Sequence, residues 1–237
     1  MKLHRVYGLK NNKDTETERR RAMENIKVDL HMHTTDSDGT ITVENLLAEI
    51  LQKGIKLFSV TEHDTMVNTL KARAFAKAND LIYINGVELT AYDEGRRHVL
   101  GYGVDPDNER LRKAMEHNKP LLDAEMEHMP HLFVTAEEAV AAILDAGGIP
   151  VLEHPGAGFY DPDYRKVINR FMGYGIKGIE CHHPENDEEI TDYCLNLCRK
   201  NDMYITGGSD YHGDCVPSRK LGMMGLELKD VSLKGLR

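Results

Sequence analysis

The sequence predicts an α/β fold with a mainly parallel sheet in one large domain. From Ile26 onward, short apolar runs alternate with amphipathic stretches, which is typical of strands joined by helices. The chain has 237 residues and 41% hydrophobic content, which suffices for one sizeable core. These observations allow two architectures, a closed barrel and an open doubly wound sheet.

The predicted elements alternate along the chain. Apolar runs predict about seven strands, over residues 26–31, 56–64, 81–89, 97–103, 149–155, 176–184 and 203–213. Amphipathic spacing predicts helices over residues 42–54, 68–80, 135–148, 164–175 and 188–201. Thr135 and Glu138 have the spacing of a capping box, which marks a helix start. Residues 104–134 are expected to be irregular.

The ends and the overall composition limit the location and the partners. Residues 1–25 are polar and charge-dense, so we expect an extension with a short exposed helix, followed by one domain over residues 26–237. Without a long apolar run or a signal-like start, the protein is expected to be soluble and cytoplasmic, with no membrane partner. The oligomeric state stays open.

Charge and cysteine content exclude further classes. A formal charge of −9 disfavours long nucleic acid, although bound cations could make one cleft locally positive and able to bind small phosphates. The cysteines form no CxxC pair and are expected to be buried free thiols. They are Cys181, Cys194, Cys198 and Cys215.

Nearly every predicted strand ends in a histidine or a carboxylate. In parallel α/β folds, the loops that follow the strands gather on one face, where active sites are built. His31 and His33 share a face because strand side chains alternate with a period of two. The other residues at these strand ends are Asp38, His63, Glu88, His98, His154, His182, His183, Asp210 and His212.

Each of these residues alone has an ordinary explanation. Most single histidines near a strand end do not bind metal, and "DSDG" could simply form an Asx turn. An EF-hand is rejected, because Thr34 and Asn45 stand where that loop requires an aspartate and a glutamate. Together, however, so many buried histidines and carboxylates require cations that neutralise them.

The donor atoms indicate the kind of ion. Imidazole and carboxylate donors without thiolates suit Zn²⁺, Mn²⁺ or Fe²⁺, and a set this large predicts two or three ions. The remaining histidines lie in polar or irregular segments and are expected to be exposed. They are His4, His117, His128 and His131.

The chain resembles the PHP family, the polymerase and histidinol phosphatase superfamily of metal-dependent phosphoesterases. The resemblance extends from residue 28 to about residue 222, through the motifs "DLHMHTTDSDG", "TEHDT", "GVEL", "HVLGYG", "GGIPVLEHPG", "GIECHHPEND" and "GGSDYHGD". It implies a distorted (β/α)₇, TIM-like barrel with a trinuclear metal centre.

The resemblance also implies a ligand set. The first metal would be held by His31, His33, Glu88 and Asp210. Glu88 would bridge to a second metal held by His98 and His154, and a third would be held by Asp38, His63 and His212. Two departures stand out: Glu62 replaces the more usual aspartate and is expected to point away from His63, and residues 104–134 are short where nucleotide-cleaving relatives have a larger helical insertion.

The resemblance and the ligand chemistry together predict hydrolysis of phosphate esters. A hydroxide bridging two metals would attack phosphorus, in a phosphomonoesterase or a nucleotide phosphoesterase. Asp64 is a candidate catalytic residue that would accept a hydrogen bond near His63, with a surface salt bridge as the alternative. His183 is a candidate that could protonate a leaving group or hold phosphate. His182 and His183 must diverge on a strand, so one faces the rim and the other packs behind it, and alternation leaves open which is which.

Arg96 and Arg97 precede His98 and are candidate substrate-binding residues, with a solvated hairpin position as the alternative for each.

The substrate stays open among a mononucleotide, a nucleoside bisphosphate, a short oligonucleotide, and a sugar or amino-alcohol phosphate. Two other functions also stay open: a metal-dependent amidohydrolase, and a non-catalytic interaction domain braced by metals.

Overall fold

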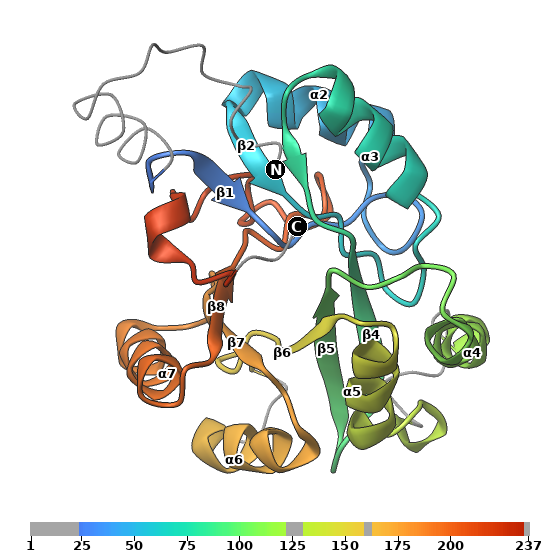
Figure 1. The fold of residues 1–237 in the computed structure, drawn as a ribbon, viewed down its shortest axis with the longest axis vertical. Coiled ribbons are helices and arrows are strands. Elements are labelled where there is room, and N and C mark those ends of the chain that lie inside the picture. Colours follow the sequence, from blue (N-terminus) through green and yellow to red (C-terminus); the bar gives the residue numbers. More distant parts are fainter. Residues whose placement is uncertain (1–23, 122–129, 159–162, 235–237) are drawn as a thin grey trace.

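The computed structural model describes residues 24–121, 130–158 and 163–234. The predicted N-terminal helix, His4 and His128 fall outside the described residues. In Figure 1, the strands surround the middle of the molecule and the helices lie outside them.

The strands form two sheets. The first is three-stranded, in the order β1 (Lys27–Asp29), β2 (Ile55–Phe58) and β3 (Ile82–Tyr83). The second follows chain order through β4 (Gly86–Tyr92), β5 (Arg96–Tyr102), β6 (Ile149–Leu152), β7 (Gly178–His182) and β8 (Tyr204–Gly207). β5 is antiparallel to both β4 and β6, whereas all the other neighbours are parallel.

The two sheets meet where the chain continues beyond β1 and β2. Met32 forms an isolated parallel bridge with Tyr211, and His63 forms one with Glu88. The backbone N–H of Asp64 donates to the Glu88 carbonyl at 2.9 Å. Within the described chain the strands therefore form a mixed α/β fold without a closed barrel, because single bridges replace a continuous ladder where the site residues begin.

Six α-helices are present in the described chain, and their ends carry the signals that the sequence contains. They are α2 (Val43–Lys53), α3 (Thr69–Ala78), α4 (Glu109–Asn118), α5 (Ala136–Asp145), α6 (Tyr164–Tyr174) and α7 (Glu188–Lys200). The predicted capping box of α5 is present, with Thr135 and Glu138 bonded in both directions. α2 begins at the N-cap Thr42 and ends at Gly54, which takes the left-handed conformation at φ 71°.

Two local expectations were wrong. Residues 104–134 contain α4 and two short 3₁₀ helices, Lys119–Leu121 and Pro130–Leu132, so the segment is not irregular throughout. α4 begins at the N-cap Asn108 and buries Leu111 and Met115 on one face. The predicted strand over residues 81–89 is two strands, β3 and β4, which belong to different sheets. A third 3₁₀ helix, Leu228–Asp230, lies near the C-terminus.

Apolar packing fills both sides of the strands. One cluster joins the helices α4–α7 to the five-stranded sheet, and a second packs α2 and α3 against β2. A third unites strand residues from both sheets, including Leu30, Leu57, Leu100 and Val151. The hydroxyl of Tyr102 lies in this cluster and donates to the Leu30 carbonyl at 3.0 Å, which ties β5 to the chain just before His31.

Three of the four cysteines, Cys181, Cys194 and Cys198, are buried free thiols as predicted, whereas Cys215 is exposed. His117 and His131 are exposed as expected, although His117 lies on α4 and faces the Leu132 carbonyl at 2.9 Å.

None of the helices in the described part of the chain has enough consecutive apolar residues to span a bilayer.

Candidate metal centre

Histidines and carboxylates from both sheets converge at one end of the strands. All nine predicted metal ligands take part in groups whose donor atoms lie within 4.8 Å of one another. Eight of the nine are buried or nearly so, and only Asp38 is exposed, with 53% of its side chain accessible. Burying so many ionisable side chains together costs free energy unless their charges are balanced.

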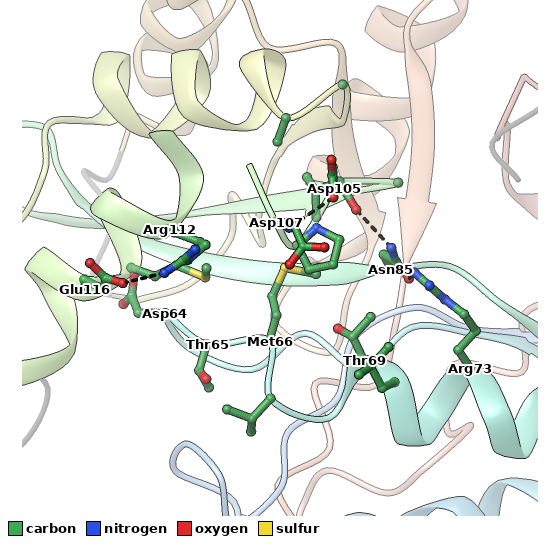
Figure 2. Close-up of a pocket in the computed structure, with 18 of the residues that line it drawn as sticks. Asp64, Thr65, Met66, Thr69, Arg73, Asn85, Asp105, Asp107, Arg112 and Glu116 are labelled. Carbon is green, nitrogen blue, oxygen red and sulfur yellow. Dashed lines mark hydrogen bonds and ion pairs between the residues drawn. The ribbon is translucent and has the colours of Figure 1, made fainter. Parts of the chain in front are cut away.

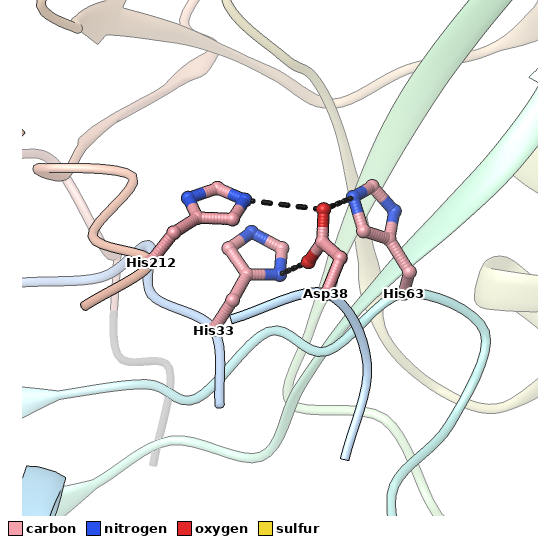
Figure 3. Close-up of side chains that lie close together, drawn as sticks. All are labelled: His33, Asp38, His63 and His212. Carbon is pink, nitrogen blue, oxygen red and sulfur yellow. Dashed lines mark ion pairs between the residues drawn. The ribbon is translucent and has the colours of Figure 1, made fainter. Parts of the chain in front are cut away.

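The first group is His33, Asp38, His63 and His212 (Figure 3). Its centre is the Asp38 carboxylate, which lies 3.5 Å from His33 Nδ1, 3.5 Å from His63 Nε2 and 3.3 Å from His212 Nε2. These residues come from the loop after β1, the segment after β2 and the loop after β8. Three imidazoles and one carboxylate at these distances can enclose a single divalent ion.

The second group is Glu88, His98, Glu153 and His154, and every member is buried. Glu88 on β4 lies beside His98 on β5, with Oε1 at 2.6 Å from His98 Nδ1. Glu153 and His154 follow β6 directly, and Glu153 Oε1 is in close contact with His154 Nε2. Glu153 was not among the predicted ligands.

His31, His33 and Asp210 form the third group and link it to the other two. Asp210 Oδ1 lies 3.2 Å from Nε2 of both histidines, and Glu88 Oε2 lies 3.0 Å from His31 Nε2 and 3.1 Å from His33 Nε2. Glu88 therefore contacts all three groups through its two oxygens.

A fourth group consists of His31, Glu180 and His183, and it shares His31 with the third group. Glu180 Oε1 is 2.9 Å from His31 Nδ1, and its other oxygen accepts the backbone N–H of His154 at 3.0 Å. Glu180 thus fixes the His31 ring with Nε2 facing Glu88 and Asp210, an arrangement common for metal-binding histidines. Glu180 was not among the predicted site residues, although a glutamate inside the apolar run "GIECH" is a visible signal.

Burial and neighbouring charges shift the pKa values in the cluster. Burial alone would lower the pKa of His31, but Asp210, Glu180 and Glu153 raise it well above its usual value. Against the same burial, hydrogen bonds to Asp210 and Glu88 raise the pKa of His33 to about 10. Burial lowers the pKa of His63 to about 3. The cluster thus has excess negative charge around His31 and His33, which cations can offset.

The loop after β8 places Asp210 and His212 under tight constraints. Asp210 has a φ of 50°, a left-handed conformation that aspartate and asparagine tolerate better than most residues. The Asp210 carbonyl lies 2.7 Å from His212 Nδ1, which leaves His212 Nε2 to face Asp38. Gly208 passes so close to His31 that a Cβ atom there would lie 2.4 Å from the His31 Cβ.

Glu62 holds the loop that carries Asp38. Its carboxylate accepts hydrogen bonds from the hydroxyls of Thr34 and Ser37, both at 2.5 Å, and from the Asn68 amide at 3.0 Å. It also accepts the Thr34 backbone N–H at 3.0 Å. Glu62 lies in none of the ligand groups, so it braces the loop rather than facing the cluster.

His183, a predicted catalytic residue, lies at the cluster, whereas Asp64 faces elsewhere. His183 Nε2 is 3.3 Å from Asp210 Oδ2, and His182 turns away toward the Asp230 carbonyl at 3.2 Å. Asp64 is buried and accepts the Asn118 amide at 2.7 Å and the Thr90 backbone N–H at 3.4 Å. The alternative of a surface salt bridge is therefore wrong for Asp64.

The arginines near the site differ from the sequence expectation. Arg97 is buried and donates to the Arg96 carbonyl at 2.8 Å, so it is not a solvated hairpin residue, and Arg96 is partly exposed. Arg219, which was not among the predicted site residues, forms close ion pairs with Asp210 and Glu185. No motif marked Arg219, because it follows the last predicted strand in a loop without a recognisable pattern.

A pocket of about 780 Å³ opens beside the metal centre, between α3 and α4 (Figure 2). It is lined by Asp64, Arg73, Asp105 and Arg112 among others, but by none of the nine predicted ligands. The pocket adjoins the cluster at Asp64, which follows His63 in the chain, and its lining adds no donor to the ligand groups.

The buried donor atoms fit divalent metal ions. Both oxygens of Glu153 are buried, and Oε1 faces the imidazole nitrogens of His154 and His98, while His63 Nδ1 lies 3.4 Å from Glu88 Oε1. Imidazole and carboxylate groups are the donors that zinc, manganese and iron take in proteins, and several sit within bonding reach of a common point.

The sequence matches a known protein family over the segment that contains most of the cluster. Residues 29–148 match the model of the PHP domain, and this stretch includes the first six predicted ligands, from His31 to His98. The chain belongs to the PHP domain family. A solved structure with a similar fold is that of a candidate metal-dependent phosphoesterase from Bifidobacterium adolescentis, which superposes with a TM-score of 0.69 at 22% identity, covering 83% of this chain and 91% of the other.

Two PHP relatives extend the similarity over most of the chain. A phosphoribosyl 1,2-cyclic phosphate 1,2-diphosphodiesterase from Eggerthella lenta is 26% identical, with 78% of this chain and 94% of the relative covered. A 5'-3' exoribonuclease from Haemophilus influenzae is 30% identical, with 80% of this chain and 91% of the relative covered.

Proposed function

We propose that this PHP protein is a metal-dependent hydrolase of phosphate esters. The observation that carries the proposal is the convergence of three donor groups through the shared residues His31, His33 and Glu88. The two relatives described above are named as a diphosphodiesterase and an exoribonuclease, which both act on phosphodiesters. Phosphate ester hydrolysis is thus supported by the site and by the family.

The proposed centre holds two or three Zn²⁺, Mn²⁺ or Fe²⁺ ions. His33, Asp38, His63 and His212 would hold one, and His31 and Asp210 with Glu88 would hold another. Glu88 with His98 and His154 would hold a third. Ions held by these residues would supply an activated water near neutral pH and would offset the negative charge of a phosphate.

His183 is proposed to act on the substrate. Its Nδ1 accepts the backbone N–H of Glu185 at 3.1 Å, so in the neutral ring the proton is on Nε2. Nε2 points to the Asp210 carboxylate at the edge of the cluster. From that position the neutral His183 ring can donate a hydrogen bond from Nε2 to a phosphate oxygen or to the leaving oxygen.

Arg219 is proposed to contact the substrate phosphate beside His183. Its guanidinium reaches both Asp210 and Glu185, and a planar fork of N–H donors matches phosphate oxygens. The contacts of Arg97 with the Arg96 carbonyl make that residue a weaker candidate, and Arg96 stays a predicted substrate contact. Asp64 is proposed to support β4 through Asn118 and Thr90 rather than to touch the substrate.

The finer architecture also belongs to this proposal. The isolated bridges at Met32 and His63 place β1 next to β8 and β2 next to β4, which supports a distorted (β/α)₇ barrel interrupted at the metal centre. Residues 26–237 would form this PHP unit, with Ile26 already buried in the core. Small phosphorylated molecules, nucleotides and short oligonucleotides are the proposed substrate classes.

Hydrolysis of generic substrates tests the proposal. Protein stripped with a chelator and reloaded with Mn²⁺ is assayed on bis(p-nitrophenyl) phosphate, p-nitrophenyl phosphate and p-nitroacetanilide. We expect phosphate ester cleavage that disappears on stripping and returns on reloading. Cleavage of the amide alone would favour an amidohydrolase, and full metal occupancy without any cleavage would favour a non-catalytic, metal-braced domain.

A further inference from the structure

We propose that Glu153 is a direct ligand of the metal held by Glu88, His98 and His154, a role that no motif assigned to it. The inference rests on the proposed metal centre, but it does not depend on which reaction the centre performs. Glu153 immediately precedes His154, one of the nine predicted ligands, in the segment "LEHPG".

The first support is the surroundings of the Glu153 carboxylate. Only 1% of the residue is exposed, and the nitrogen atoms nearest to its carboxylate belong to imidazole rings of the ligand groups rather than to a lysine or an arginine. A carboxylate removed from water in this way is strongly disfavoured unless a cation or several donors compensate it. The described neighbours provide no lysine or arginine paired with it.

The second support is direction. Glu153 Oε1 lies in close contact with His154 Nε2, 3.5 Å from His98 Nδ1 and 3.8 Å from His31 Nε2. The oxygen therefore points to the same space as the imidazole nitrogens of three candidate ligands. Imidazoles that bind a metal through these nitrogens are unprotonated, so they cannot stabilise the carboxylate by themselves.

The end of β6 explains how neighbouring residues reach one site. β6 is Ile149–Leu152, so Glu153 and His154 lie just beyond the regular strand and escape the alternation that would send them to opposite faces. The His154 backbone N–H donates to Glu180, which holds this bend in place.

Glu153 changes the charge of this ligand group. Glu88 is shared with the neighbouring group through His31 and His33, so Glu153 adds the carboxylate charge that offsets the double charge of this ion. The group also gains a fourth protein donor, one more than the three that leave an open position on catalytic zinc. Glu153 is therefore expected to tighten this position.

The test compares Glu153→Gln with the wild type, with and without metal. The melting temperature is measured in excess EDTA and in Mn²⁺, and bound metal per chain is measured after dialysis against graded EDTA. We expect the variant to melt at the same or a higher temperature than the wild type in EDTA, because a buried charge is gone. Its gain on adding Mn²⁺ is expected to be smaller, with metal affinity at this position lowered ~10–100-fold.

Asp93→Asn is the matched control. Asp93 is also a buried carboxylate, but it pairs with Arg170 and with the Tyr174 hydroxyl at 2.9 Å, and it belongs to none of the ligand groups. This change is expected to lower the melting temperature equally in EDTA and in Mn²⁺, with unchanged metal content.

An equal Mn²⁺ gain and equal metal content in Glu153→Gln and in the wild type would overturn the proposal. Because a glutamine oxygen can itself coordinate weakly, Glu153→Ala is measured in parallel and must show the larger loss of metal. If the wild type binds metal with this contrast but cleaves no phosphate ester, the proposed function fails and the assignment of Glu153 stands.

Discussion

At the scale of single residues, the two carboxylate oxygens of Asp210 face two different sets of side chains. Oδ1 faces His31 and His33, whereas Oδ2 faces His183 and Arg219. The carboxylate therefore lies between the candidate metal ligands and the candidate phosphate contacts. Neutralising it should disturb both without changing the shape of the side chain.

Asp210→Asn is expected to reduce turnover by about a hundredfold or more, because the change replaces a carboxylate that we propose as a metal ligand by an amide. Asparagine tolerates the left-handed backbone at φ 50°, so the fold should persist. Steady-state kinetics together with circular dichroism check this. His31→Ala is expected to behave in the same way, and wild-type turnover in either variant would count against the site.

Glu62 makes a residue-scale prediction away from the ligands themselves. Glu62→Gln cannot accept hydrogen bonds from Thr34, Ser37 and Asn68 on both oxygens, so we expect a loss of about 1–3 kcal/mol in the free energy of unfolding. Weaker metal binding is also expected, because the loop carries Asp38. Urea denaturation and metal titration measure the two effects.

The control for Glu62 is Glu44→Gln, the same chemical change at an exposed residue paired with Lys71 at 2.6 Å. Exposed pairs contribute little, so its urea midpoint and metal affinity should match the wild type. If the two variants were indistinguishable, Glu62 would have no positioning role.

The sequence predicted the polar residues that end each strand, because the period of a strand and the gathering of parallel strand ends are general rules. It did not predict Glu180, which lies inside a strand, or Arg219, which no strand or motif brings to the site. Glu153 was hidden because strict alternation would have turned it away from His154. These residues depend on where a strand ends and how a loop returns, which a local pattern does not contain.

At the scale of elements, the loop after β8 packs directly onto β1. Gly208→Ala would place a Cβ atom 2.4 Å from the Cβ and backbone N of His31, so either the loop or His31 must shift. We expect a lower melting temperature and at least tenfold weaker metal binding, since a misplaced ligand costs about as much as a lost supporting contact.

Gly173→Ala is the matched control for Gly208→Ala. Gly173 lies inside α6, and a Cβ atom there would meet nothing within 4 Å. Alanine favours the helix by about 1 kcal/mol over glycine, so this variant should be as stable as the wild type or more stable, with unchanged metal binding. Equal metal affinity in both variants would show that Gly208 does not position His31.

Elements with marked ends were the most predictable. The capping box at Thr135 located the start of α5 correctly, and the helix predicted over residues 42–54 ends at Gly54, which takes the left-handed conformation. α4 escaped prediction although Asn108 caps it, because its mean character is strongly polar and only one narrow face is buried. The division of residues 81–89 into β3 and β4 depends on which sheet each half joins, and that is decided by tertiary pairing.

At the scale of the whole molecule, two sheets share one end where all the ligand groups meet. Parallel pairing of β1–β3 and of β6–β8 follows from the helical connections, which the sequence predicted. The antiparallel pairing of β5 with both neighbours and the absence of a continuous closing ladder within the described strands could not be read from local patterns. The site is thus an assembly of distant segments held by both sheets.

The most direct test of the central claim is a crystal structure of Mn²⁺-loaded protein with anomalous scattering data collected at the manganese edge. The account predicts two or three anomalous peaks, enclosed by the donor atoms of His31, His33, Glu88 and Asp210 and of the groups around Asp38 and His98. An absence of peaks among these residues in protein that retains phosphoesterase activity would contradict it.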